Sequence, residues 1–159
     1  MAAVTADYIS SVKLEGVHED VAAIKTGVTL YTGTLVCKNT LGRLVDGDNL
    51  ADYTMAGELV EIINDSGAVI AAGTGNTGGT VKGKYRWGHQ YLASVLTAAR
   101  TYSNLNRNVY VMTNREVSDL TAAGTAAVRV IAGTLVAFGS TTATGWVAIR
   151  VQGAANAGV

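Results

Sequence analysis

The sequence predicts a mainly β protein: a compact antiparallel β-barrel or sandwich built from hairpins, with an extended N-terminal arm and at most one or two short helices. Three observations support this. Short apolar runs recur along the chain, no helical periodicity is sustained, and the intervening turns are rich in Gly, Asn and Asp. The 159 residues include 19 Gly and no Pro, so the turns must be made without proline. This length corresponds to one ordinary domain, large enough for a substantial core.

The expected strands are apolar or alternating segments bounded by polar or Gly-containing turns. The segment 80–95 shows the alternation most clearly, with Val81, Tyr85, Trp87 and Tyr91 at odd positions. In chain order the expected strands are 29–31, 34–37, 43–45, 58–63, 68–71, 80–95, 109–112, 117, 127–131, 134–138 and 146–151.

Two segments are helical candidates. The segment 91–105 contains LASVLTAARTYSNL, which is rich in Ala and Leu, and the segment 18–24 carries Asp20 near its start. The sequence GTGNTGG at 73–79 predicts a flexible loop or hairpin tip. The small residues of 153–159 predict a flexible C-terminal tail.

The tetrapeptide Gly-x-Leu-Val occurs three times, beginning at Gly33, Gly57 and Gly133. Each copy is followed by a Gly-containing turn and a return strand, so the pattern predicts three related β-hairpins. The irregular spacing of the copies argues against a solenoid. The alternative is chance similarity in a chain rich in Gly, Leu and Val.

The charge balance excludes some classes of partner. Twelve basic and twelve acidic residues cancel, and charged residues are 15% of the chain. A nucleic-acid-binding domain carries a large positive excess, so we expect no direct nucleic-acid binding. The longest apolar run is Ala68 to Ala72, far below the roughly 20 residues that span a bilayer, so we expect no membrane association. A surface with so little charge favours association and indicates a component of an assembly.

Two Gly-rich motifs resemble phosphate-binding loops but lack essential parts. The segment 73–78 matches Gly-x-Gly-x-x-Gly, but β-like residues follow it where a helix is required. The segment 78–84 reads Gly-x-x-x-x-Gly-Lys, but Tyr85 stands where a Ser or Thr would bind magnesium. Neither segment is therefore expected to bind a nucleotide.

The remaining reactive residue types form no catalytic or metal-binding motif. Asp46-Gly47-Asp48 lacks the spacing of a calcium loop and predicts an Asp-Gly turn. Cys37 is the only cysteine, and it is expected to be a small buried apolar residue. His18 and His89 are the only histidines, and no nucleophile or zinc motif contains them. We therefore expect no enzyme activity, no metal and no cofactor.

Three segments occur in an order that resembles the decoration (cement) proteins of tailed-bacteriophage capsids. They are Gly27-Val-Thr-Leu30-Tyr-Thr-Gly33-Thr-Leu35-Val36 with its return Leu41–Val45, then Asn108-Val-Tyr-Val-Met-Thr-Asn-Arg-Glu-Val-Ser118, and finally Ala132–Val136 with Trp146–Ile149. The resemblance covers residues 24–151 and rests on the order of all three segments.

The resemblance implies a small β-barrel-like domain without catalytic activity. It implies a homotrimer that binds the major capsid protein on the outer surface of the phage head, after assembly in the host bacterial cytoplasm. Its implied function is to clamp neighbouring capsid subunits and to stabilise the shell against internal DNA pressure. The single β-rich domain would span 21–152. Residues 73–105, which fit the family pattern less well, are a candidate insertion.

Residues 1–20 precede the matching region and are expected to form an arm that reaches the capsid protein. Val4, Tyr8, Ile9 and Val12 would be its apolar anchors. The alternative is that these four residues belong to a first strand packed on the protein's own core.

Two other functions are compatible with the sequence. One is a small-ligand-binding β-barrel with Tyr85, Trp87 and Tyr110 lining its pocket. The other is a head-fibre or tail-associated virion protein, which differs from a decoration protein only in its place on the particle.

Overall fold

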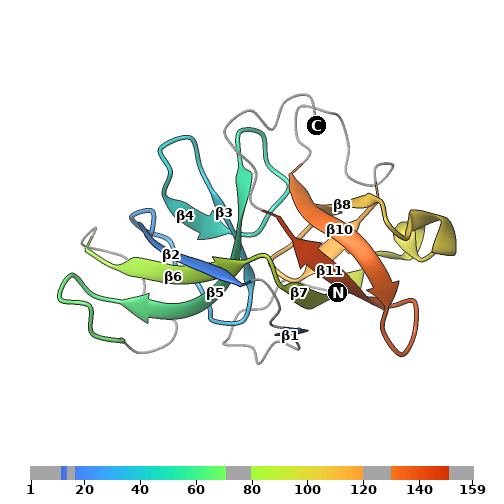
Figure 1. Ribbon diagram of the computed structural model, residues 1–159. Helices are drawn as coiled ribbons and strands as arrows, with labels where there is room; N and C mark the ends of the chain where they lie inside the picture. Colours follow the sequence, from blue (N-terminus) through green and yellow to red (C-terminus); the bar gives the residue numbers. More distant parts are fainter. Residues whose placement is uncertain (1–11, 14–16, 71–79, 120–129, 151–159) are drawn as a thin grey trace.

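The computed structural model describes residues 12–13, 17–70, 80–119 and 130–150. Its strands form two sheets that lie side by side, each curled into a barrel (Figure 1). The two helical elements are single turns of 3-10 helix. The prediction of a mainly β, antiparallel barrel fold is therefore confirmed.

The first barrel contains the strands in the order β2-β6-β5-β3-β4, with every neighbouring pair antiparallel. A parallel bridge between Ile24 and Leu44 joins the end of β2 to β4 and closes the five strands. The strands are β2 (His18–Ala23), β3 (Leu35–Lys38), β4 (Leu44–Asp46), β5 (Thr54–Ile63) and β6 (Lys82–Trp87).

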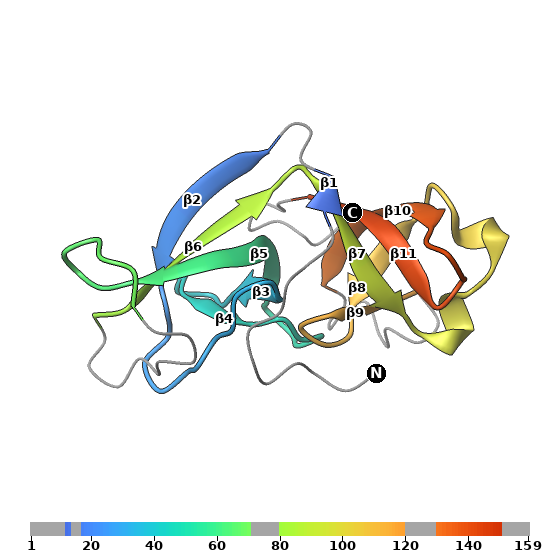
Figure 2. The same cartoon turned by 90° about the horizontal axis from the view of Figure 1, so that it is seen from below.

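The second barrel has the order β7-β11-β10-β8-β9, and a parallel pairing of β7 with β9 closes it. The short strand β1 (Val12–Lys13) adds to β7, with Val12 opposite Tyr91 (Figure 2). The other elements are β7 (Gln90–Val95), η1 (Thr97–Ala99), η2 (Tyr102–Asn104), β8 (Asn108–Val111), β9 (Glu116–Ser118), β10 (Ile131–Phe138) and β11 (Thr144–Ile149).

The two barrels have the same topology. When the five strands of each barrel are numbered in chain order, both barrels have the spatial order 1-5-4-2-3. In both barrels strands 1 and 3 are parallel where they meet. Gly57 in β5 and Gly133 in β10 occupy equivalent places, with φ of 155° and 157°. A Cβ on either would overlap a carbonyl oxygen of the adjacent fifth strand, that of Arg86 or Ala148. The chain is thus a tandem pair of one fold.

Backbone hydrogen bonds repeat in the same places. Leu59 accepts from Gly33 N–H at 2.8 Å, and Leu135 accepts from Asn106 N–H at 2.7 Å. Gly33 and Asn106 both have left-handed φ values, 78° and 62°. The Gly-x-Leu-Val copies at Gly57 and Gly133 are therefore structurally equivalent, whereas the copy at Gly33 occupies the place that Asn106 has in the second barrel.

Two clusters of buried side chains form the core. One fills the first barrel around Leu30, Leu59 and Tyr85. The other fills the second barrel and also takes in side chains from β3, β4 and β5 of the first barrel, because alternate residues of a strand face opposite sides. These shared residues are Leu35, Cys37, Val45 and Met55.

Two sequence-based expectations need revision. The helix expected at 18–24 is strand β2, held to β6 by a full ladder and by an ion pair between Glu19 and Lys84 at 3.3 Å. Of the helix expected at 91–105, the first part is strand β7 and the rest contains only η1 and η2. Strands β6 and β7 fall within the candidate insertion 73–105, and each pairs with a strand on both of its sides.

The predicted arm boundary and two predicted flexible segments can be located relative to the described residues. Strand β2 crosses the arm boundary at residue 20. The GTGNTGG loop at 73–79 and the C-terminal tail at 153–159 lie outside the described residues.

Candidate functional site

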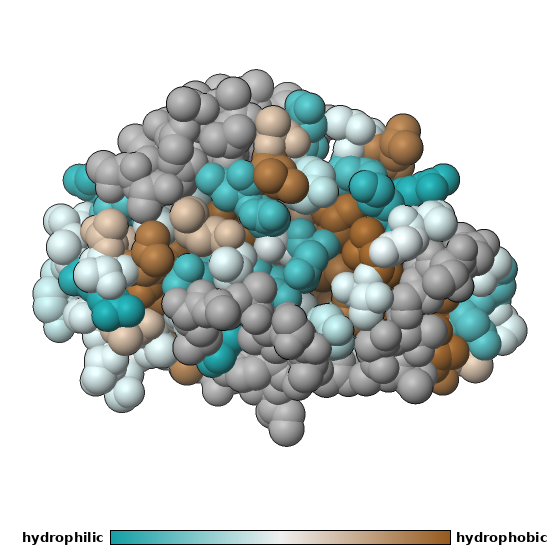
Figure 3. Space-filling view, turned by 180° about the vertical axis from the view of Figure 1, so that it is seen from behind, coloured by the Kyte–Doolittle hydropathy of each residue, from teal (hydrophilic) through white to brown (hydrophobic). Residues whose placement is uncertain are grey.

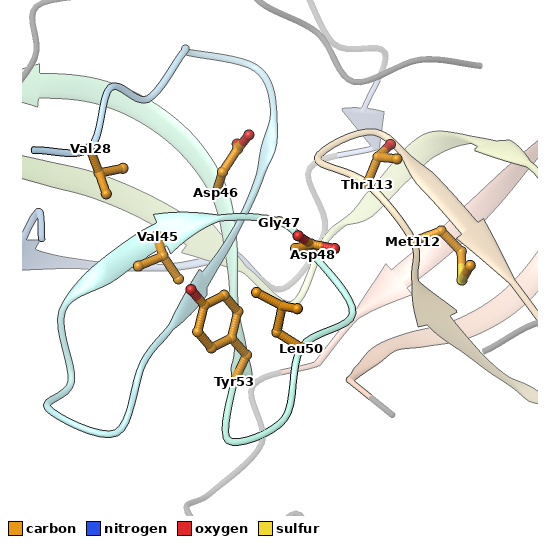
Figure 4. A pocket seen from close by; sticks show the side chains of 9 residues that line it. All are labelled: Val28, Val45, Asp46, Gly47, Asp48, Leu50, Tyr53, Met112 and Thr113. Carbon is orange, nitrogen blue, oxygen red and sulfur yellow. The ribbon is translucent and has the colours of Figure 1, made fainter. Parts of the chain in front are cut away.

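A pocket of about 260 Å³ lies where the two barrels meet (Figure 4). The first barrel contributes the β4–β5 connection and Val28, and the second barrel contributes the turn after β8. Two carboxylates share the pocket with apolar walls. Its lining residues are Val28, Val45, Asp46, Gly47, Asp48, Leu50, Tyr53, Met112 and Thr113.

Asp46 is the most perturbed carboxyl group of this pocket. Its Oδ2 accepts a hydrogen bond from Asn114 Nδ2 of the second barrel at 3.2 Å, whereas its buried Oδ1 has no partner among the described residues. The pKa of Asp46 is raised to about 6. Burial is the largest cause of the rise, hydrogen bonds from Asn114 and Gly47 oppose it, and the nearby charge of Asp48 adds to it. The group therefore titrates near neutral pH.

Replacing Asp46 with asparagine is expected to stabilise the protein at pH 8 by about 1–2 kcal/mol, after allowance for partial exposure. The pKa of Asp46 is about 6 in the folded protein and about 3.8 when unperturbed, so its ionised form disfavours folding above pH 6. That cost disappears as the pH falls below 4, where both states are protonated. Urea unfolding of Asp46→Asn and wild type at pH 8 and pH 4 measures the difference.

The exposed pocket residue Asp48 provides the control. Asp48→Asn is expected to change stability by less than about 0.5 kcal/mol at either pH. An equal gain for Asp46→Asn at pH 4 and pH 8 would contradict the assigned titration.

A buried charged cluster lies beside the link from β6 to β7. Glu58 accepts from Arg86 Nε at 3.0 Å and from Arg86 Nη2 at 3.3 Å, and its Oε2 lies 2.7 Å from His89 Nε2. Glu58 is 2% exposed and His89 is 0% exposed. The residue types would suit proton transfer, but the enclosure of both side chains separates them from any substrate in this conformation.

Cys37 is also enclosed. Burial raises the pKa of its thiol to about 12, and its Sγ lies 4.0 Å from the carbonyl oxygen of Asp48. A thiol this far from ionisation is a poor nucleophile and a poor metal ligand. The Cys37 side chain packs in the buried cluster that the two barrels share.

The structure describes only part of the expected arm. Val12 lies in β1, where its backbone pairs with Tyr91 of β7. Val4, Tyr8 and Ile9 lie outside the described residues.

The three aromatic residues expected to line a ligand pocket do not line the pocket between the barrels. Tyr85 is 2% exposed inside the first barrel. Trp87 stacks on Tyr85 and on His18, with ring centroids 5.7 Å apart in each case. Tyr110 packs against Ile131 in the second barrel.

Sequence reasoning missed Glu58 and the burial of Asp46. A signal existed for Glu58, because a carboxylate directly before Leu59 and Val60 in an apolar strand is a candidate for a buried charge. A charge in that setting requires a partner. One short stretch of sequence then supplies the guanidinium of Arg86 and the imidazole ring of His89.

Within the described part of the chain, no three His, Cys, Asp or Glu side chains gather where they could hold a metal ion. No helix in the same residues combines the length and apolar character needed to cross a membrane. Comparisons of the whole chain with family models, with curated proteins and with solved structures found no match.

Proposed function

We propose that this chain is a capsid decoration protein, a structural virion component that trimerises on the outer surface of a phage head and clamps neighbouring major capsid subunits. The observation that carries the proposal is the pair of barrels with apolar cores, in which Glu58, His89 and Cys37 are enclosed. Such a molecule acts through its outer surface. The order of motifs resembling cement proteins then favours a capsid as the surface it meets.

The exposed surface suits protein contacts. Figure 3 shows apolar residues scattered among hydrophilic ones on one face of the molecule. Leu41 is 76% exposed on the β3–β4 turn, Val69 is 64% exposed after β5, and Tyr102 is 73% exposed in η2. Contacts through such residues, on a chain with few charges, avoid the cost of burying unpaired charge.

The proposed mechanism is mechanical. Cyclic symmetry repeats each subunit contact around the ring, so modest contacts sum to a tight trimer. Docking of three subunits at once raises the effective concentration of each contact. The two barrels of each subunit, joined by their shared core cluster, give it two outer surfaces with which to bridge adjacent capsid proteins.

The test is co-sedimentation of the purified protein with undecorated, mature-size shells of its source phage. Saturable binding of three copies at each three-fold position is the expected result. A protein that stays in the supernatant as a stable monomer would contradict the proposal and favour the ligand-binding barrel. Binding to fibres or tails but not to shells would favour the other virion role.

A further inference from the structure

The outer edge of β2 is open. Along its inner side β2 pairs with β6 over six residues, but on its outer side only Ile24, just past its end, bridges to β4. His18, Glu19, Asp20 and Val21 are all exposed. Figure 2 shows β2 as the outermost strand of its barrel, and no described residue pairs with its outer edge.

The register identifies which backbone groups face outward. Ile24 N–H donates to Val81 on the β6 side, and Lys25 N–H donates to Leu44 on the β4 side. Because alternate residues of an antiparallel strand direct their N–H and C=O groups to opposite sides, Glu19 and Val21 direct theirs to the open edge. There the Val21 N–H donates to Oδ1 of the neighbouring Asp20 at 2.7 Å, a local bond that a docked strand would replace.

The second barrel shows what an edge of this kind binds. Strand β7 is the counterpart of β2: Val95 donates to Ala143 as Ile24 does to Val81, and Leu96 donates to Val117 as Lys25 does to Leu44. The outer edge of β7 is occupied by β1, which pairs with Gln90 and Tyr91.

The same register relates individual residues of the two edges. Glu19 lies opposite Arg86 of β6, and Gln90 lies opposite Ala148 of β11. Arg86 and Ala148 are equivalent, because their carbonyl oxygens face the equivalent glycines Gly57 and Gly133. Glu19 therefore corresponds to Gln90, and Asp20 corresponds to Tyr91.

We infer that the open edge of β2 binds the N-terminal strand of a second copy of this chain. A strand placed on β2 as β1 lies on β7 has Lys13 opposite Glu19 and Val12 opposite Asp20. An opposite-charge pair directly across an antiparallel ladder stabilises it, whereas on β7 the residue opposite Lys13 is the uncharged Gln90. Glu19 already pairs with Lys84 of its own chain at 3.3 Å, so Lys13 would join a second cation beside this exposed carboxylate, and charge complementarity favours this occupant over an acidic or apolar strand.

Exchange between copies is feasible because little holds β1 in its own chain. Among the described residues its pairing with β7 spans Val12 and Lys13, and the open edge of β2 presents the backbone groups of Glu19 and Val21 to a strand of the same kind. When β1 of one copy binds the β2 edge of the next copy, the contact is head-to-tail. Head-to-tail contacts form closed rings when the rotation that relates neighbouring copies divides a full turn evenly. The inference rests on the self-association in the proposed function and is independent of capsid binding.

Disulfide trapping tests the register. In a Cys37→Ala background, Val12→Cys and Asp20→Cys are made as separate proteins, mixed and oxidised. A Val12–Asp20 pair is non-hydrogen-bonded in this register, which brings side chains close enough for a disulfide. We expect a covalent dimer only in the mixture, and none when Asp65→Cys, an exposed acidic position on the β5–β6 connection, replaces Asp20→Cys.

An edge-blocking variant provides the second readout. Val21→Pro removes an outward N–H without touching the β6 ladder, so it is expected to shift the mass in light scattering from an oligomer to the 16.4 kDa single chain. Val21→Thr is the matched control and is expected to remain oligomeric. Unchanged urea unfolding of Val21→Pro shows that the fold is intact.

The outcomes separate this inference from the proposed function. No disulfide in the mixture, or an oligomer that survives Val21→Pro, overturns the β2 docking site even if shells bind the protein. A further variant carries Val12→Cys and Asp20→Cys in one chain; if it forms a disulfide within that chain and no dimer, the inference is overturned in favour of a hairpin of β1 with β2. A trapped dimer together with no binding to shells supports the docking site and contradicts the capsid role.

Discussion

Replacing Gly133 with alanine is expected to destabilise the protein by on the order of 3–5 kcal/mol. Gly133 has a φ of 157°, and a Cβ on it would overlap the carbonyl oxygen of Ala148 in the neighbouring strand. Both atoms belong to the backbone, so no side-chain rotation can relieve the overlap and β10 must move away from β11. Urea unfolding followed by tryptophan fluorescence, with Trp146 on β11 as a nearby reporter, measures the loss.

Two further glycine variants calibrate this result. Gly57→Ala is expected to cost about as much, because Gly57 faces the carbonyl oxygen of Arg86 in the same way. Gly67→Ala is the control: its φ is 84° in an exposed turn with nothing near the added Cβ, so only about 1 kcal/mol is expected. If Gly133→Ala cost no more than Gly67→Ala, the close approach of the two strands would be wrong.

Replacing Glu58 with threonine is expected to cost about 3–5 kcal/mol, the usual effect of removing one partner of a buried ion pair. The change leaves the Arg86 guanidinium and the His89 ring without the carboxylate they share. Threonine is the residue that the second barrel carries at the equivalent place, Thr134, where β10 is intact. Urea unfolding at pH 7 measures the loss.

A second substitution separates loss of charge from loss of packing. Ala148 is the second-barrel counterpart of Arg86, so Glu58→Thr with Arg86→Ala recreates the neutral pair of the second barrel and is expected to recover at least half of the loss. Glu19→Gln, which breaks the exposed ion pair with Lys84, is expected to cost less than about 1 kcal/mol. An equal cost for Glu58→Thr and Glu19→Gln would contradict the role of burial.

Local turn chemistry was readable from the sequence. The Gly-containing turn predicted after the Gly-x-Leu-Val copy at Gly33 is present: Asn39 Oδ1 accepts from the N–H groups of Leu41 and Arg43, and Gly42 has a φ of 72°. These interactions join residues at most four apart, so composition and order suffice to predict them.

The strand at 18–23 was not readable, because its conformation depends on a distant partner. Glu19, Asp20 and Ala22 favour a helix over a strand, and the exposed strand shows no alternation of apolar residues. Pairing with β6, including the Glu19–Lys84 ion pair, overrides that local preference.

The tandem repeat was only partly visible for a related reason. The fold requires a particular backbone conformation at each equivalent position of the two barrels, but it does not require the same residue. Gly33 and Asn106 occupy one such pair of positions, and both have left-handed φ values. The buried site needed three elements to meet: Glu58 on β5, Arg86 on β6 and His89 after it. Residue type could mark Glu58 as unusual, but only the topology shows which cations reach it.

The core shared by the barrels has a consequence for synthesis on the ribosome. The first barrel is complete once β6 has emerged, yet Leu35, Cys37, Val45 and Met55 are buried in a cluster built mostly by the second. During translation of residues 90–149 these side chains therefore remain uncovered on the nascent chain, where exposed apolar surface recruits chaperones or neighbouring chains. Slow elongation through β7–β11 would lengthen that exposure and lower the yield of folded protein.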